Sequence, residues 1–267
     1  MRAEVANNAT PLNSSFDPHM KVILVLLSVA FLFWTVGCSM IERKLLFYPT
    51  HRPHDNSLTP WAENGQVIGY ARHVDSPHNI WLMLHGNAGQ ASDRLYVVPS
   101  FSPDDSIYIL EYPGYGNRQG TPSKEAFNEA AKEAYELLRK KYPHIPVCVV
   151  SESIGSGPAS FLASLNHPPD KLVLIVPFDT LSRVAEDHFP SFLVRLLLTD
   201  NWDNVQALSN YRGPVEIIGA GSDTIIPVKH AKALAATVPG SKLKIINGGH
   251  NDWSYEGRVT IRNSSGV

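Results

Sequence analysis

Short, mostly apolar runs alternate with stretches of helical periodicity along most of this chain. The apolar runs span residues 80–84, 107–110, 146–150, 171–176, 215–218 and 243–246. The clearest helical pattern, residues 123–142, begins at Ser123, which can cap a helix, and is followed by Pro143. Strands that are apolar on both faces are typical of parallel sheets covered by helices on each side. The sequence therefore predicts an α/β fold with a mostly parallel, doubly wound sheet.

Most of the predicted strands lead into loops that contain glycine. These loops are residues 85–89, 111–116, 151–155, 219–223 and 247–250. Because the carboxyl ends of parallel strands meet at one edge of the sheet, we expect the loops to gather in space. A further strand is expected at 66–74. Residues 42–65, which are rich in proline, histidine and polar residues, are expected to form an approach segment.

The segment PVCVVSESIGSGPA, residues 146–159, combines a buried strand, a turn of small residues and the start of a helix. Ser153 lies in the turn, within SESIG at 151–155. A serine at a sharp strand-to-helix turn has a strained backbone, so the residues two positions before and after it must be small. The helix that follows presents free N–H groups where negative charge would develop on a substrate. Ser153 is therefore a candidate nucleophile.

A serine hydroxyl is a poor nucleophile near neutral pH and needs a base, which a carboxylate in turn orients. Asp223 and His250 each follow a predicted strand, and with Ser153 they stand in the order serine, acid, histidine. The loop at 247–250 distinguishes His250 from the other histidines, most of which lie in polar contexts. Asp179 and Asp187 remain alternative candidates for the acid.

The negative charge that forms on an attacked carbonyl needs hydrogen-bond donors, which we call the oxyanion hole. The backbone N–H of Ile154, directly after the candidate nucleophile, is one expected donor. The second is the backbone N–H of Asn87, in the glycine-bearing loop at 85–89. His85 is expected to brace this loop rather than to take part in the chemistry.

These motifs together resemble the α/β-hydrolase superfamily. They are HGNAG at 85–89, YPGYG at 112–116, SESIG at 151–155, GSDTIIP at 221–227 and GGHND at 248–252. The resemblance covers roughly residues 45–253 and is greatest to small serine hydrolases with an HGNAG loop, a group that includes protein depalmitoylases and serine-aminopeptidase-like proteins. It implies an α/β-hydrolase fold with a Ser153–Asp223–His250 triad, and a mechanism that needs no cofactor.

Two features depart from the pattern of the superfamily. Ser151 stands where the first glycine of the elbow is usual. The residues after His250 end in VTIRNSSGV at 259–267, which does not resemble the C-terminal helix that the superfamily usually has. The second departure puts the stability of this end of the domain in question, although it leaves the three candidate catalytic residues in place.

Composition excludes several classes of function. A formal net charge of −2 gives no basic footprint for nucleic acid. No cluster of His, Cys, Asp and Glu has the spacing of a metal site, and no phosphate-binding P-loop is present. The two cysteines, Cys38 and Cys148, are expected to stay unpaired, with Cys148 an inert residue of a core strand. The length of 267 residues suits one large α/β domain, expected at 42–267.

An uncharged segment precedes this domain. Residues 1–20 are polar and expected to be disordered, whereas residues 22–41 carry no charge and follow Lys21. Twenty such residues suit a single membrane-spanning helix. A secretory signal fits the positive start and the apolar core. TVGC at 35–38 also resembles a bacterial lipobox, in which Cys38 would be lipidated, and we favour this envelope lipoprotein over the spanning helix at 21–41.

Residues 178–212 contain short helical patterns between two predicted strands and are expected to form a small helical lid. We call them the lid segment. Its apolar stretch at 192–198 suggests a lipophilic acyl substrate. The resulting hypothesis is a membrane-attached serine hydrolase that cleaves a small-molecule ester or thioester. A peptidase or amidase of the same fold, and a non-catalytic membrane-attached binding protein, are the alternatives.

Overall fold

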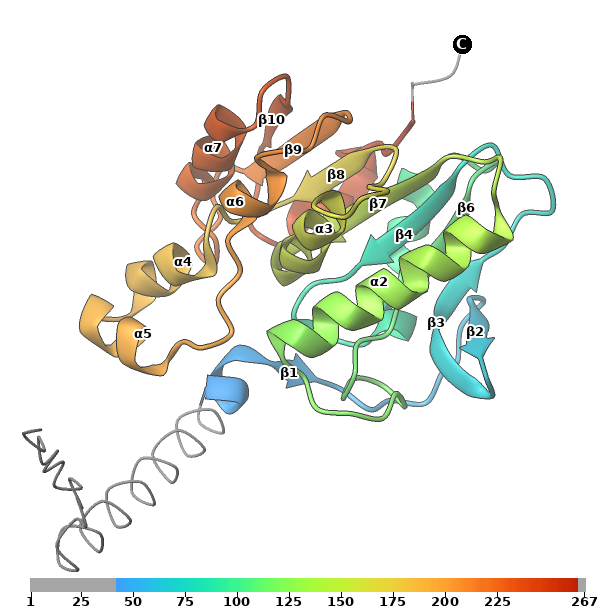
Figure 1. Ribbon diagram of the computed structural model, residues 1–267, viewed down its shortest axis with the longest axis horizontal. Helices are drawn as coiled ribbons and strands as arrows, with labels where there is room; N and C mark the ends of the chain where they lie inside the picture. The colour runs from blue at the N-terminus through green and yellow to red at the C-terminus, as the bar shows by residue number, and fades with distance from the viewer. Residues whose placement is uncertain (1–41, 264–267) are drawn as a thin grey trace, which may run out of the picture. The chain divides into compact units, whose positions relative to one another are not determined.

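The computed structural model describes residues 42–263, and within them eight strands form the central sheet (Figure 1). From one edge to the other the strands are β10 (Lys242–Ile246), β9 (Val215–Ala220), β8 (Leu172–Ile175), β7 (Val147–Glu152), β4 (Ile80–Leu84), β6 (Ser106–Leu110), β3 (Gln66–Arg72) and β2 (Thr59–Glu63). The strands from β10 to β6 are parallel, whereas β3 and β2 are antiparallel to their neighbours. The expectation of a mostly parallel sheet is confirmed.

Three expectations concern residues outside the described part of the chain. They are the disorder of residues 1–20, the membrane anchor at 21–41 and the lipidation of Cys38, and they stay predictions. Within residues 42–263, no helix has both the length and the apolar character that crossing a bilayer requires.

Side chains of the central strands alternate between two hydrophobic cores, one on each face of the sheet. In β4, Ile80, Leu82 and Leu84 join the first core, while Trp81 and Met83 join the second. All five are fully buried. This alternation follows from the two-residue repeat of a strand. It also explains why the strand is apolar throughout, since both of its faces are covered.

Helices cover both faces, which confirms the doubly wound arrangement. The first core is closed by α2 (Lys124–Lys141), α3 (Ser156–Ala163), α6 (Asn204–Leu208) and α7 (Val228–Thr237) (Figure 1). The second is closed by the 3-10 segments η1 (Ala91–Ser100) and η3 (Asp252–Gly257). As expected, Ser123 caps α2, and its side chain accepts a hydrogen bond of 3.1 Å from the Ala126 N–H.

The lid segment contains α4 (Leu181–His188), α5 (Ser191–Leu197) and α6 between β8 and β9. The expected short helices are therefore present. In Figure 1, α4 and α5 lie apart from α2 and α3, the helices that cover the centre of the sheet. Their arrangement leaves parts of α5 exposed to solvent.

The approach segment at 42–65 contains regular elements that the sequence analysis did not predict. Residues 42–46 are helical, β1 (Tyr48–Pro49) pairs with β5 (Ala88–Gly89), and β2 forms an edge of the main sheet. Pro60 within β2 obscured the strand in the sequence. A proline cannot donate a backbone hydrogen bond, so strands that contain one are found at sheet edges.

The residues after η3 pack on the second core without forming a helix. Val259 and Ile261 are 1% and 0% exposed and belong to that core. The Ile261 N–H donates to the Ser100 carbonyl at 2.8 Å, and Lys171 Nζ donates to the Arg262 carbonyl at 2.6 Å. These residues are thus held against the sheet without the C-terminal helix that the superfamily usually has.

The strand order contains a switch point beside β4. The chain passes from β4 to β6 on one side, and then to β7 on the other side. In open α/β sheets, ligands bind in the crevice that such a reversal leaves at the carboxyl ends of the strands. The loops after β4 and β7, which carry Asn87 and Ser153, border this crevice.

Candidate active site

Ser153 directly follows β7 and begins the short 3-10 turn η2 (Ser153–Gly155), which continues into α3. Its φ is +56°, in the left-handed region that residues other than glycine rarely adopt. This conformation costs roughly 1–2 kcal/mol. The residue is 7% exposed, and its hydroxyl has no hydrogen bond to any residue of the described chain. The serine thus has the strained turn that the sequence predicted and an unengaged oxygen.

The position two residues after Ser153 has no room for a side chain. A Cβ at Gly155 would lie 2.2 Å from the carbonyl oxygen of Leu84 and 2.8 Å from that of His85. These are backbone atoms at the end of β4, so they cannot move aside easily. Two positions before the serine, Ser151 is fully buried, and its hydroxyl has no partner in the described chain. The small residues of the elbow therefore have a steric origin.

Gly155→Ala should lower the free energy of unfolding by about 3 kcal/mol or more, because the new methyl group collides with the end of β4. Urea unfolding checks this. Gly221→Ala is the matched control, since its Cβ would meet nothing nearer than 3.4 Å, and its cost should stay below about 1 kcal/mol. Equal stability of the Gly155→Ala protein and the control would contradict this packing.

Asp223 and His250 are in contact. His250 Nδ1 lies 2.7 Å from Asp223 Oδ2, so the ring N–H donates to the carboxylate. The other carboxylate oxygen, Oδ1, accepts hydrogen bonds of 2.8 Å from the N–H groups of Ile225 and Ile226. The Asp223 side chain is fully buried and that of His250 is 9% exposed. Both oxygens of Asp223 are therefore occupied, which fixes the carboxylate and the ring.

Backbone hydrogen bonds between the loops after β9 and β10 place this pair. The Ser222 N–H donates to the Gly248 carbonyl at 2.9 Å, and the Gly221 N–H donates to the Ile246 carbonyl at the same distance. Asp252 Oδ2 accepts the Gly249 N–H at 2.8 Å and holds the turn before His250. Neighbouring parallel strands thus deliver the acid and the histidine to one edge, as the loop argument predicted.

The elbow and the His250 loop are connected through an aromatic bridge. No hydrogen bond joins Ser153 to His250 within residues 42–263. Instead, the Tyr96 hydroxyl donates to Glu152 at 3.2 Å, next to Ser153, and the Tyr96 ring lies 6.3 Å from that of Trp253. The structure therefore joins Asp223 with His250 directly, and Tyr96 connects Glu152, the residue before Ser153, with Trp253 in the segment after His250.

The expected oxyanion donors lie in two different environments. The Asn87 N–H has no acceptor among the described residues. The Asn87 side chain braces its loop, since Oδ1 accepts from the Tyr115 hydroxyl at 2.9 Å and Nδ2 donates to the Leu46 carbonyl. Ile154 lies in the first turn of η2, where helical N–H groups lack intrahelical acceptors. Both N–H groups are thus available as donors.

His85 and Arg94 orient the peptide that carries the Asn87 N–H. His85 Nδ1 lies 2.7 Å from the Gly86 carbonyl oxygen, and Arg94 Nη2 donates to the same oxygen at 3.4 Å and to the Ala88 carbonyl. In a trans peptide the carbonyl and the next N–H point in opposite directions. Holding the Gly86 carbonyl therefore fixes the direction of the Asn87 N–H, in line with the bracing role expected of His85.

Sequence patterns did not indicate Arg94, which lies in η1 at a kink. Burial acts to lower the pKa of its guanidinium, but Glu152 and Tyr96 outweigh burial and raise it. Arg94 is therefore a buried cation between the loop after β4 and the residue before Ser153. A lone arginine in a short helical stretch carries no pattern that reports such a long-range contact.

The alternative acids, Asp179 and Asp187, are engaged with a different histidine. His230 Nδ1 and Nε2 lie 2.8 Å from Asp179 Oδ1 and Asp187 Oδ2, respectively. Arg183 also pairs with Asp179 at 2.7 Å, and Lys229 pairs with Asp187. This cluster joins α4 of the lid segment to α7. Neither aspartate contacts His250, so the geometry favours Asp223 as its partner.

Protonated His230 should stabilise the attachment of α4. Burial acts to lower the pKa of His230, but its hydrogen bonds to Asp179 and Asp187 outweigh burial and raise it. A raised pKa in the folded state means that the contribution to stability is present below the unfolded value of about 6.5 and is lost as pH rises through the folded value. Burial acts to raise the pKa of Asp179, but hydrogen bonds from His230 and Arg183 outweigh burial and lower it to about 2.

His230→Gln should therefore destabilise the protein more near pH 5.5 than near pH 9. Urea unfolding of His230→Gln and of the unsubstituted protein at the two pH values gives the difference in the free energy of unfolding. The titration of the other histidines is the same in both proteins and cancels in this difference. A loss of stability that is the same at both pH values would contradict an ionised His230.

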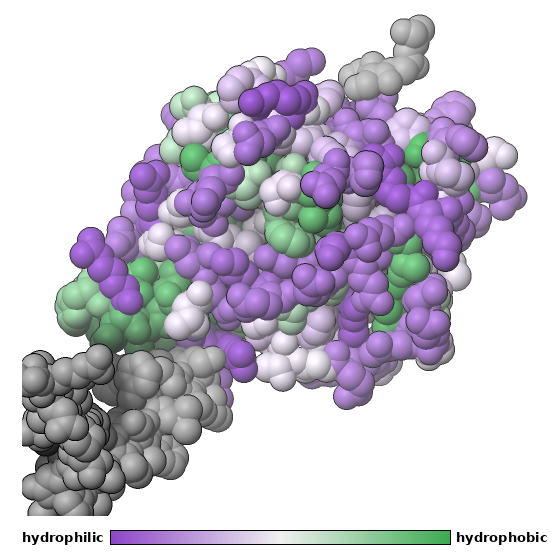
Figure 2. All heavy atoms as spheres, viewed as in Figure 1, coloured by the Kyte–Doolittle hydropathy of each residue, from purple (hydrophilic) through white to green (hydrophobic). Residues whose placement is uncertain are grey.

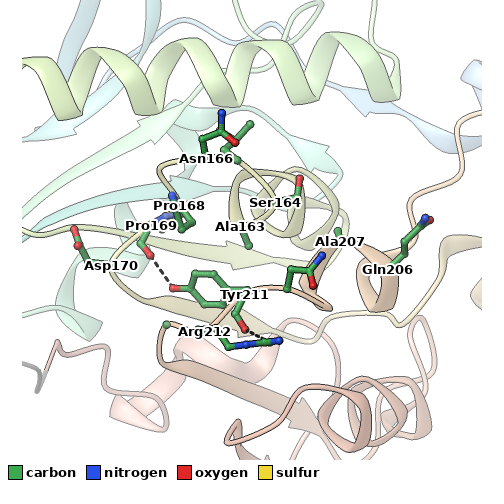
Figure 3. Close-up of a pocket in the computed structure, with 13 residues that line it drawn as sticks. Ala163, Ser164, Asn166, Pro168, Pro169, Asp170, Gln206, Ala207, Tyr211 and Arg212 are labelled. Atoms are coloured by element: carbon green, nitrogen blue, oxygen red, sulfur yellow. Dashed lines mark hydrogen bonds between the residues drawn. The ribbon is translucent and has the colours of Figure 1, made fainter.

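A separate pocket of about 600 Å³ lies at the amino ends of the strands, opposite the candidate active site (Figure 3). Its lining comes from the end of α3 and from the loops that precede β8 and β9, where the Tyr211 hydroxyl donates to the Pro169 carbonyl at 2.8 Å. None of the candidate catalytic residues lines it. Because it lies at the amino ends of the strands, it is not part of the candidate active site.

Cys148 is a free, fully buried cysteine in β7, and burial raises the pKa of its thiol to about 12. It therefore stays protonated, as an inert residue of the core. Within the described residues, no group of three or more His, Cys, Asp or Glu side chains is placed to hold a metal ion.

Comparisons of sequence identify relatives at low identity. No protein-family model matches the chain. The uncharacterized protein Rv2307c of Mycobacterium tuberculosis is 29% identical over 258 residues, which cover 90% of each chain. The lysophosphatidylserine lipase ABHD12 of Danio rerio is 28% identical over 194 residues, which cover 65% of this chain. The match spans only 50% of the length of that lipase.

Comparisons of structure show the fold. TT1662 from Thermus thermophilus superimposes with a TM-score of 0.61 at 16% identity, covering 76% of this chain and 93% of the other. The Pyrococcus furiosus esterase Pf2001 gives a TM-score of 0.60 at 13% identity, covering 77% and 91%. The expected α/β-hydrolase fold is confirmed. At these identities the likeness extends to the fold alone.

Proposed function

We propose that this chain, which has the α/β-hydrolase fold, is a serine hydrolase that cleaves an ester or thioester bond through an acyl-enzyme on Ser153. One observation carries the proposal: a buried Asp223–His250 pair lies at the sheet edge where a strained serine follows β7. Strain of this kind persists only where the surrounding structure imposes it, and it is concentrated at functional sites. The similarity to a lysophosphatidylserine lipase, and the fold shared with an esterase, are consistent with an acyl substrate.

In the proposed reaction, His250 Nε2 accepts the proton of Ser153 as Oγ attacks the substrate carbonyl. Asp223 keeps the other ring proton on Nδ1 and stabilises the imidazolium that forms. The N–H groups of Asn87 and Ile154 donate to the oxyanion. His250 then protonates the leaving alcohol or thiol. Water hydrolyses the acyl-enzyme by the same steps in reverse, so no cofactor is required.

We also propose that the protein is attached to a membrane through residues 21–41. A lipid on Cys38 is the favoured form, as in bacterial envelope lipoproteins, and a single spanning helix is the alternative. Mass spectrometry of the membrane-bound protein distinguishes them. A chain that begins at residue 38 with added acyl mass supports the lipoprotein, whereas an unmodified residue 38 within a longer chain contradicts it.

A substrate panel tests the proposed activity. The full chain should hydrolyse p-nitrophenyl esters and acyl thioesters faster than aminoacyl anilides, and Ser153→Ala should abolish each activity. The resemblance to protein depalmitoylases predicts turnover of long-chain thioesters, and that to serine-aminopeptidase-like proteins predicts turnover of anilides. Faster cleavage of anilides than of any ester would replace this proposal by a peptidase. No turnover of any substrate would favour a binding protein.

A further inference from the structure

An apolar patch on the lid segment has no partner in the described structure. Phe189, Phe192 and Leu196 are 56%, 68% and 49% exposed, and their spacing puts them on one side of α5 and the residues before it. Figure 2 shows apolar side chains gathered over α5. Burying large apolar side chains is favourable, so exposed groups of them mark surfaces that bind something apolar.

The patch extends to the rim of the candidate active site. His188, at the end of α4, lies 2.9 Å from the Ile225 carbonyl through Nε2. Ile225 is itself 51% exposed, and its N–H donates to Asp223. Phe189, Phe192, Leu196 and Ile225 are called the α5 patch below. Ile225, at one end of this patch, is therefore only two residues after Asp223, the proposed catalytic acid.

The start of the described chain lies beside the end of α5. Glu42 is 4% exposed, and its carboxylate accepts the N–H groups of Thr199 and Asp200 at 2.7 Å each. Thr199 is only two residues beyond the last residue of α5. The entry of the chain into the fold is thus fixed next to the α5 patch.

The sequence before Glu42 bears on what the patch contacts. The uncharged run at 22–41 ends at Ile41, directly before Glu42 in the sequence. Cys38 is four positions before Glu42, a span of at most about 14 Å. With either proposed anchor, the bilayer therefore lies within a short reach of α5. Exposed Arg195 on α5 has no ion-pair partner among residues 42–263, which suits a side chain that reaches lipid headgroups.

We infer that the α5 patch docks on the surface of the bilayer, so that the candidate active site faces membrane-resident acyl esters. The occupant is lipid, rather than a second copy of the chain, because the membrane-proximal residues enter the fold beside the patch. Docking does not require catalysis. The statement about the substrate rests on the proposed function and on the proposed membrane attachment.

The first experiment measures contact with lipid. The full chain, with Phe192→Cys carrying a fluorophore, is reconstituted into phosphatidylcholine vesicles that contain nitroxide lipids as quenchers. Leu243→Cys is the control, because Leu243 is an exposed apolar residue on the edge strand β10. Any label on Cys38 is the same in both proteins. We expect strong quenching at 192 and little at 243. Equal quenching, or self-quenching at 192 that grows with protein density as a second copy would cause, overturns the inference.

The second experiment separates docking from chemistry. Phe192→Ser with Leu196→Ser should slow hydrolysis of a long-chain ester in vesicles by about tenfold, because two large apolar contacts with lipid are lost. Hydrolysis of a short, water-soluble ester should stay unchanged. Leu243→Ser with Ile245→Ser, a matched exposed pair on β10, should alter neither rate. Equal slowing of both substrates overturns the inference.

The two proposals fail in different ways. If Ser153 is not the nucleophile, Ser153→Ala leaves hydrolysis of both esters intact. The quenching at residue 192 is still observed in that case. If α5 does not dock, the quenching is absent, while Ser153→Ala still abolishes hydrolysis of the soluble ester.

Discussion

Asp223→Asn should lower kcat for ester hydrolysis by about 10⁴-fold while the protein stays folded. The reason lies in the two backbone N–H groups, of Ile225 and Ile226, that donate to Oδ1. They would hold the amide oxygen of an asparagine, so its NH₂ group would face His250 Nδ1. The ring would then have to accept at Nδ1 and carry its proton on Nε2, where it could not take the proton of Ser153.

Asp203→Asn is the matched control for this substitution. Asp203 caps α6 through a hydrogen bond of 2.8 Å from the Gln206 N–H, and asparagine caps helices equally well. The kcat of the Asp203→Asn protein should therefore equal that of the unsubstituted protein. Initial rates on a short p-nitrophenyl ester, with circular dichroism to verify folding, measure both variants. An Asp223→Asn protein with more than about a tenth of the original kcat would exclude Asp223 as the acid.

Ser153→Gly should abolish hydrolysis and leave a protein that is more stable than Ser153→Ala by about 1 kcal/mol. Both substitutions remove the nucleophile, so each should reduce kcat by at least about 10⁴-fold. They differ in the backbone, because only glycine adopts a φ of +56° without strain. Urea unfolding of the two variants measures the difference in the free energy of unfolding.

The comparison has an internal control at Ser164, where φ is −86°. At such an ordinary position alanine should be more stable than glycine, by about 0.5–1 kcal/mol. The order of the two variants should therefore reverse between residues 153 and 164. The same order at both positions would mean that the turn at Ser153 is not strained.

The strands could be predicted where both faces of the sheet are covered. Residues 80–84 were expected to form a strand, and β4 has these bounds, because a strand that is buried on both sides is apolar throughout. At the edge this signal disappears. β2 contains Pro60 and Glu63 and is mostly exposed, so nothing in its composition distinguishes it from a loop.

The approach of Asp223 to His250 was also expected, because both follow strands of a parallel sheet and such loops meet at one edge. The catalytic roles of both residues stay predictions. The residues that brace the site could not be found in this way. Arg94 reaches the Gly86 and Ala88 carbonyls from the kink in η1, and Glu152, which is buried beside the elbow, accepts a hydrogen bond from Tyr96 of the same segment. Such contacts depend on three-dimensional packing, which a single sequence does not reveal.

Treatment of the full chain with a fluorophosphonate probe, followed by peptide mass spectrometry, tests the proposed nucleophile most directly. If Ser153 is activated by His250, the probe should add to the Ser153 hydroxyl alone, and the Asp223→Asn variant should react far more slowly. An unlabelled protein, or labelling that persists in Ser153→Ala, would contradict the proposed mechanism.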